Sequence, residues 1–383
     1  MLSQMGTYMQ IVAEGWLIYR LTDSAFTLGL VGFVAMIPLI PWTLVSGSLA
    51  DRFPRRKLLF ITQLALIFPP LLLAFLTWQE TVQVWHIVII SFIMGALSAL
   101  DQPSRQALVV DTVNKEDMDQ AVALSATGYN LARVIGPVLA GWLIASFGEA
   151  IPFLINGVSF LAVAGVLALM ILPENSKEPE EEGKTVVGSL LDGLQYAIQK
   201  RIILGFMAMI IIVNLFIVPY QTLLPVFSRD IYQAGAMGLG LLTTAAGIGA
   251  IIGSILVANI KSGHRGRMII ILGSVMITTA VGFALSPNFA IACIALLFAS
   301  GTLVAIKVFA LMFVQQEVDN KIRGRIMSIV VLFDAGVPRL GGLLAGALVV
   351  YIGAPITIVV GALGCTIFGI LLYTFVPSLR RIV

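Results

Sequence analysis

Long apolar runs, separated by short charged or turn-forming stretches, recur along the whole chain of 383 residues. Most of them reach the roughly 20 residues that an α-helix needs to cross a bilayer. Only helices and closed barrels satisfy their backbone groups in lipid, and strand-like alternation is missing here. We therefore predict an all-α integral membrane protein with twelve transmembrane helices, at residues 1–20, 27–50, 58–78, 83–105, 119–147, 150–173, 201–228, 237–260, 268–286, 288–314, 322–352 and 354–377.

The composition argues against several other classes of protein. Charged residues make up 11% of the chain, against about 25% in a soluble domain. The two cysteines lie in apolar runs and the two histidines at opposite predicted membrane faces, so we expect neither a disulfide nor a metal site. No phosphate-binding loop and no nucleophile–base motif is present. We expect no enzyme activity, no cofactor and no nucleic-acid partner.

The first apolar run is marginal as a transmembrane helix. It contains Gln4, Gln10 and Glu14, and it lacks the basic start of a cleavable signal peptide. We expect the chain to begin inside its first helix, through a truncated or wrongly assigned start.

The basic residues fix a predicted orientation, because loops rich in Lys and Arg stay in the cytoplasm. Of the 23 basic residues, 18 lie in loops or termini on one side, and only Arg20 and Arg229 lie in loops on the other. With an even number of spans, both termini are predicted to be cytoplasmic, in a multi-pass protein of the cytoplasmic membrane.

The longest loop divides the chain into two halves of six spans. It opens with five glutamates and continues with Leu190, Leu191, Leu194 and Ile198 at helical spacing, which predicts an amphipathic surface helix. We expect an N-terminal half at 1–173, a cytoplasmic linker at 174–200 and a C-terminal half at 201–383.

The two halves repeat each other in sequence. The segment 95–101 matches 301–307 at an offset of 206, so that Lys307 takes the place of Asp101, and Arg133 matches Arg339 at the same offset. Two parallel six-helix repeats are the arrangement of the major facilitator fold.

Specific motifs resemble that superfamily. The loop residues Gly47, Asp51, Arg52, Arg55 and Arg56 are similar to its loop signature, with Pro54 where the family often has glycine. A second set resembles the branch that contains the enterobactin exporter and related efflux pumps: Asp101, Pro103, Arg105, Gln106, Asn130, Ala132, Arg133, Val134, Ile135, Gly136, Pro137, Ala140 and Gly141. The glycine–proline part of this set resembles the antiporter signature.

The resemblance implies a secondary active transporter that works by alternating access. It implies export of a small hydrophobic or amphipathic molecule, siderophore-like or drug-like, in exchange for protons. Uptake of a metabolite by the same fold and a non-transporting membrane scaffold remain as alternatives. We expect a monomer embedded in the lipid bilayer.

The basic loop predicts a latch between the halves. Asp51 ends the second predicted span, and an acid there can accept hydrogen bonds from a helix N-terminus such as that near Gly324 and Arg325. Asp101 and Arg105, one helical turn apart, are expected to pair with each other or with this cytoplasmic gate, and to act in gating rather than in substrate contact. The alternative is a solvated loop that only sets the orientation.

Charges inside predicted spans are functional candidates, because they are costly in hydrocarbon. Glu14 shares a helix face with Gln10 and could carry a proton, or it could simply pair with a basic residue. The remaining candidates for a proton or substrate cavity are Lys307, Asp334, Arg339 and the seventh-span residues Asn214, Tyr220 and Gln221, for which interhelical hydrogen bonding is the alternative.

Overall fold

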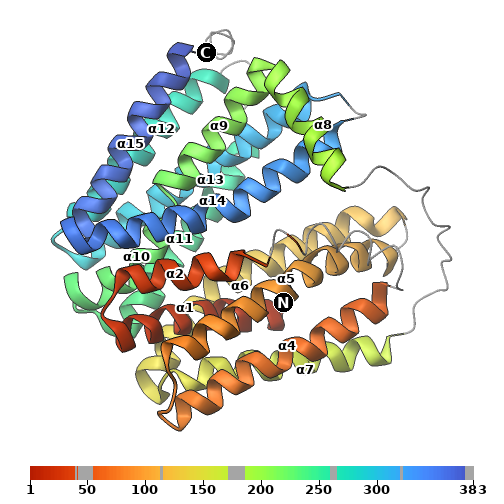
Figure 1. Cartoon of the computed structure of the whole chain (residues 1–383), viewed down its shortest axis with the longest axis vertical. Coiled ribbons are helices and arrows are strands. Elements are labelled where there is room, and N and C mark those ends of the chain that lie inside the picture. The colour runs from red at the N-terminus through yellow and green to blue at the C-terminus, as the bar shows by residue number, and fades with distance from the viewer. Residues whose placement is uncertain are drawn as a thin grey trace. The chain divides into compact units, whose positions relative to one another are not determined.

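The computed structural model describes residues 1–38, 41, 55–112, 115–170, 186–258, 265–319 and 322–375, and nearly all of them are helical (Figure 1). The first six predicted spans correspond to α1 (Leu2–Thr22), α2 (Ala25–Met36), α4 (Arg55–Trp78), α5 (Val84–Thr112), α6 (Met118–Phe147) and α7 (Ala150–Leu169), with a short 3-10 helix, η1 (Lys115–Asp117), before α6. After the helix α8 (Val186–Gln199), the other six correspond to α9 (Arg201–Phe216) with α10 (Tyr220–Val226) and the π-helical η2 (Phe227–Ile231), then α11 (Gly235–Ala258), α12 (Arg265–Leu285), α13 (Phe289–Glu317), α14 (Arg323–Ile352) and α15 (Ala354–Phe375).

Ten segments in the described part of the chain are long and apolar enough to cross a membrane. They coincide with the third to twelfth predicted spans. Helix α1 has the length of a span but is more polar, and α2 is a shorter apolar helix. Each of the twelve predicted ranges contains part of a described helix, with 39–40 and 42–50 of the second range outside the described residues. The predicted all-α membrane fold is confirmed.

The chain forms two compact units. The first comprises Met1–Asp23, Val31–Val186 and Gly235–Gly240, and the second comprises Ser24–Leu30, Val187–Ala234 and Leu241–Val383. Within the first unit, α4 packs along α7 and α5, and α1 packs against α6 and α7. Within the second, α9 packs against α13, α14 and α15, and α12 lies along α13 (Figure 1).

The core of the second unit is aromatic and aliphatic. Phe206 of α9 stacks on Phe313 of α13 with ring centroids 4.6 Å apart, and Phe309 and Ile326 are buried beside them. Elsewhere large apolar side chains are exposed, such as Phe68 and Trp78 on α4. Large apolar side chains exposed on transmembrane helices suit a lipid environment.

Candidate transport site

An ion pair joins two helices of the second unit. Lys307 Nζ of α13 pairs with Asp334 Oδ1 of α14, and Asn214 Nδ2 of α9 donates to the same oxygen at 3.0 Å. Asn214 is fully buried, and its Oδ1 atom has no hydrogen-bond partner. The structure thus brings together three residues that the sequence singled out separately.

Glu14 has a different environment. It accepts a hydrogen bond from the Ser91 hydroxyl of α5 and interacts with the Gln10 amide one turn earlier on α1. No basic side chain among the described residues pairs with it. Its partners are therefore neutral, which differs from the alternative that Glu14 forms an ion pair with a basic residue.

The third intramembrane acid, Asp101 of α5, is paired as expected. Arg105 Nη2 lies 3.1 Å from Asp101 Oδ2, and Gln63 Nε2 of α4 donates to Asp101 Oδ1. Asp101 is 9% exposed. The ion pair and the amide together balance its charge and tie α4 to α5.

Two intramembrane arginines lack an acidic partner within the described part of the chain. Arg339 of α14 donates from Nη1 to the Ala335 carbonyl of its own helix at 2.8 Å. Arg133 of α6 lies close enough to act electrostatically on the Tyr8 hydroxyl of α1. Tyr8 in turn meets Tyr129 of α6 edge to face, with ring centroids 5.8 Å apart.

The antiporter-like segment of α6 makes two close helix contacts. An added Cβ at Gly136 would lie 2.9 Å from Tyr8 Cβ and 3.0 Å from the Met5 carbonyl oxygen of α1. One at Gly141 would lie 2.8 Å from the Ala236 carbonyl oxygen, in the first turns of α11 that belong to the same unit. Pro137 lies between these contacts, and Asn130 is half-buried one turn before Arg133.

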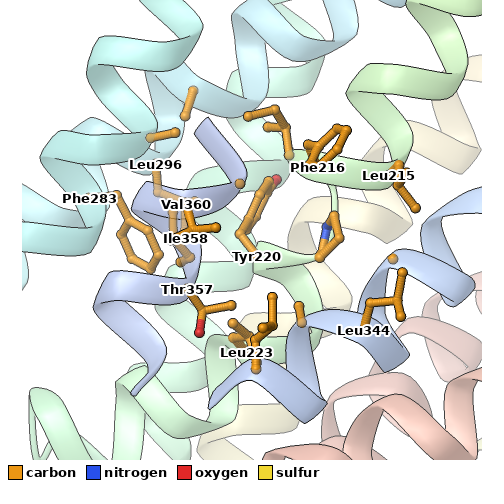
Figure 2. A pocket seen from close by; sticks show the side chains of 18 residues that line it. Leu215, Phe216, Tyr220, Leu223, Phe283, Leu296, Leu344, Thr357, Ile358 and Val360 are labelled. Carbon is orange, nitrogen blue, oxygen red and sulfur yellow. The ribbon is translucent and has the colours of Figure 1, made fainter. Parts of the chain in front are cut away.

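Tyr220 lines an apolar cavity of about 210 Å³ inside the second unit. Figure 2 shows Tyr220, Phe216 and Ile358 around it. The cavity lies where the seventh span breaks between α9 and α10, and helices α12 to α15 complete its wall. Gln221 is exposed beside it and donates to the Tyr220 hydroxyl at 3.4 Å.

Gln10 forms a hydrogen bond between α1 and α7. Its Oε1 atom accepts from Asn156 Nδ2 of α7 at 2.6 Å, and Gln10 is only 3% exposed. Gly6 allows this approach, because a Cβ there would lie 2.6 Å from Asn156 Oδ1.

The predicted latch lies largely outside the described residues. Gly47, Asp51 and Arg52 are not among them, and Arg55 is described only as the first backbone position of α4. Arg56 donates to the Leu167 and Ala168 carbonyls at the end of α7, both at 3.0 Å. The latch therefore stays a prediction.

At the other predicted side of the latch, Arg325 pairs with Asp192 of α8 at 2.8 Å. Gly324 precedes it at the start of α14, where an added Cβ would meet nothing within 4 Å. The helix α8 is thus attached to α14 by a charge pair.

Sequence reasoning missed the neutral partners. Gln63, Ser91 and Asn156 lie in apolar runs without a motif, and Tyr8 and Tyr129 are ordinary aromatic residues by pattern. An offset of 206 places Tyr8 opposite Asn214 in the repeat, which is a signal that could have drawn attention to it. No group of His, Cys, Asp and Glu side chains in the described residues could hold a metal ion.

Ten apolar segments long enough to span a membrane, with charged residues within several of them, indicate a membrane transporter. The chain belongs to the transmembrane secretion effector family of the major facilitator superfamily, whose sequence profile matches residues 1–381. Members of this family move small molecules across membranes and are not enzymes.

Curated relatives agree with this assignment. The staphyloferrin A transporter of Staphylococcus aureus is 26% identical over 350 residues, which are 89% of this chain and 85% of the relative. The enterobactin exporter EntS of Shigella flexneri is 26% identical over 375 residues, or 95% and 86% of the two chains. A bacterial homologue of the human lysosomal transporter Spinster has the same fold, with a TM-score of 0.74 at 12% identity over 100% of this chain and 97% of that one.

Proposed function

We propose that the protein is a secondary active exporter that moves a small amphipathic molecule out of the cell in exchange for protons, by alternating access. The observation that carries the proton coupling is the environment of Glu14. An exchanger needs a group in the membrane that can hold a proton in one step and release it in another.

Glu14 suits this role better than the other two intramembrane acids. Asp101 is bound to Arg105, and Asp334 is bound to Lys307. Each of these two carboxylates is thus engaged by a cationic side chain, whereas no described basic side chain pairs with Glu14. The partners of Glu14, Ser91 and Gln10, can hydrogen-bond either form of the carboxyl group.

The direction and the kind of substrate rest on the relatives and on the cavity. Enterobactin and staphyloferrin A, which appear in the relatives' names, support a siderophore-like cargo. The apolar cavity at Tyr220 supports a cargo with an apolar part, as in drug-like molecules. We propose that the protein is a monomer in the cytoplasmic membrane. Both termini lie inside the cell in this proposal, because the loop charges favour that orientation.

The test compares cells that express the wild type, Glu14→Gln or no protein. Mass spectrometry of the medium and of the cell contents identifies the compound that leaves cells only when the wild type is present. We expect Glu14→Gln to reduce its export at least tenfold. The exposed Glu80, in the turn between α4 and α5, provides the matched control Glu80→Gln, which should export normally.

Two results would contradict the proposal. Export by Glu14→Gln at the wild-type rate would exclude Glu14 as the proton carrier. Accumulation of the compound inside wild-type cells would favour uptake, the alternative function for this fold.

A further inference from the structure

The charges inside the membrane do not balance. Among the described residues, Asp101 and Asp334 are paired with bases, whereas Arg133 and Arg339 have no acidic partner. An arginine remains protonated under all physiological conditions, so it cannot escape the cost by losing its charge. Glu14 of α1 interacts with Ser91 and Gln10 and forms no ion pair with Arg133. A bound anion, or water that reaches the side chain, would compensate the charge of Arg133.

Arg133 lies too deep to reach the lipid headgroups. The apolar segment Gln120–Phe147 has Arg133 near its middle, roughly 20 Å from either end at 1.5 Å per residue. The hydrocarbon core is about 30 Å thick, and an arginine side chain can snorkel only near a helix end. A headgroup phosphate is thus a poor candidate for the missing anion.

The sequence repeat shows how the charges on α6 differ from those on α14. At an offset of 206, Asp334 and Arg339 of α14 correspond to Gly128 and Arg133 of α6. The C-terminal half therefore carries an acid on this helix, engaged by Lys307, whereas the N-terminal half has a glycine at that position. No residue of the first unit replaces the acid among those described.

Two tyrosines lie near Arg133. Tyr129 precedes Arg133 by one turn of α6 and so shares its face, and Tyr8 of α1 meets the Tyr129 ring edge to face. Tyr129 is 41% exposed, so part of its surface is not covered by the described residues. Gly136 keeps α1 close enough for this arrangement.

From this we infer that Arg133, Tyr8 and Tyr129 bind the anionic group of the transported molecule, with an aromatic or other planar group of that molecule against the tyrosine rings. The guanidinium group can donate two hydrogen bonds to a carboxylate. The tyrosine rings offer an apolar surface and hydroxyl groups. The substrate class is therefore an aromatic carboxylate or a similar planar anion, an inference that rests on the proposed transport function.

The test measures binding of two matched probes to the purified full-length protein. 1-Naphthoate carries an aromatic ring and a carboxylate, and 1-naphthamide has the same shape without the charge. Binding is measured by calorimetric titration in phosphatidylcholine nanodiscs, with empty discs as the blank. This lipid carries no net charge, so anionic headgroups do not compete with the probes. We expect the wild type to prefer naphthoate at least tenfold.

Variants then assign the site. Arg133→Gln should lose the preference for naphthoate, and Arg133→Lys should keep part of it. Tyr129→Ala should lower the affinity for both probes. The control Arg201→Gln removes an exposed arginine at the start of α9 and should bind as the wild type does. A folded Arg133→Gln protein is recognised by an unchanged thermal midpoint.

Equal affinity of the wild type for both probes, no binding of naphthoate, or an unchanged preference in Arg133→Gln would overturn the inference. None of these outcomes tests proton-coupled export, which is measured separately with the Glu14→Gln variant. Conversely, loss of coupling without any effect on probe binding would leave the anion site standing.

Discussion

The ion pair between Lys307 and Asp334 is partly exposed: the side chains are 25% and 44% exposed. Breaking a fully buried ion pair is strongly destabilising, whereas an exposed pair contributes little. Asp334 also accepts a hydrogen bond from the side-chain amide of the fully buried Asn214. Removal of one partner should therefore have an intermediate cost.

Lys307→Met alone should destabilise the protein by about 1–3 kcal/mol, because Asp334 is left without its cation. The double variant Lys307→Met, Asp334→Leu should recover most of that loss. Thermal unfolding in detergent, followed by a dye that reacts with Cys293 and Cys365 as they become accessible, measures the difference. A double variant no more stable than the single one would show that the pair is not the cause.

At the level of residues, the sequence identified the charges inside the apolar spans but not their partners. Glu14, Asp101, Lys307 and Asp334 stood out because charge is rare in apolar runs. Whether each is paired depends on which helices are neighbours and how they are rotated. The neutral partners Ser91 and Gln63 carry no signal in a single sequence, so the difference between Glu14 and Asp101 emerged only from the structure.

Helix α6 depends on glycine where it meets α1. An alanine at Gly136 would place its Cβ 2.9 Å from Tyr8 Cβ and 3.0 Å from a backbone oxygen, so one helix must shift. At Gly128 of the same helix, the nearest atom to an added Cβ is 3.7 Å away, which is an ordinary contact.

Gly136→Ala should lower the thermal midpoint and reduce export, although alanine is the better helix former by about 1 kcal/mol. Gly128→Ala should leave the midpoint unchanged or raise it slightly. Both variants have the same chemical change on one helix, so a thermal melt of the pair isolates the α1 contact. Equal midpoints would show that α1 and α6 are not closely packed at Gly136.

Helix α8 is attached to α14 in a similar way. A Cβ at Gly193 would lie 3.0 Å from Ile329 Cδ1 and 3.3 Å from Arg325 Cβ, next to the pair between Asp192 and Arg325. The amphipathic pattern predicted a helix in this linker, but the partner surface on α14 was not visible in the pattern.

Gly193→Val should loosen α8 from α14 and raise hydrogen exchange of the α8 amides severalfold, because local opening exposes backbone hydrogen bonds. Gly273→Val in α12 is the control, since an added Cβ there meets nothing within 4 Å. Unchanged exchange of α8 in Gly193→Val would show that this contact does not hold the helix.

On the scale of the whole molecule, the fold was predictable because each span needs only length and apolarity, and the repeat then indicates two halves. The break between α9 and α10 was not predicted. The seventh span looked continuous by hydropathy, yet the helix is interrupted before Tyr220, and the apolar cavity lies at that interruption. Periodicity does not reveal such a break, because the residues on both sides remain apolar.

The predicted orientation leads to a labelling experiment. In a variant without Cys293 and Cys365, a cysteine introduced at Thr81, between α4 and α5, should react with a membrane-impermeant maleimide in intact cells. A cysteine at Lys200, between α8 and α9, should react only after permeabilisation. The reverse pattern would show that the loop charges were misread.

Proton exchange in liposomes tests the central claim most directly. The purified protein is reconstituted with a pH-sensitive dye inside, and the compound identified in the medium is added outside without a pH gradient. We predict that its entry drives protons out, so that the interior becomes alkaline with the wild type and with Glu80→Gln but not with Glu14→Gln. Acidification of the interior, or alkalinisation by Glu14→Gln at the wild-type rate, would contradict the account.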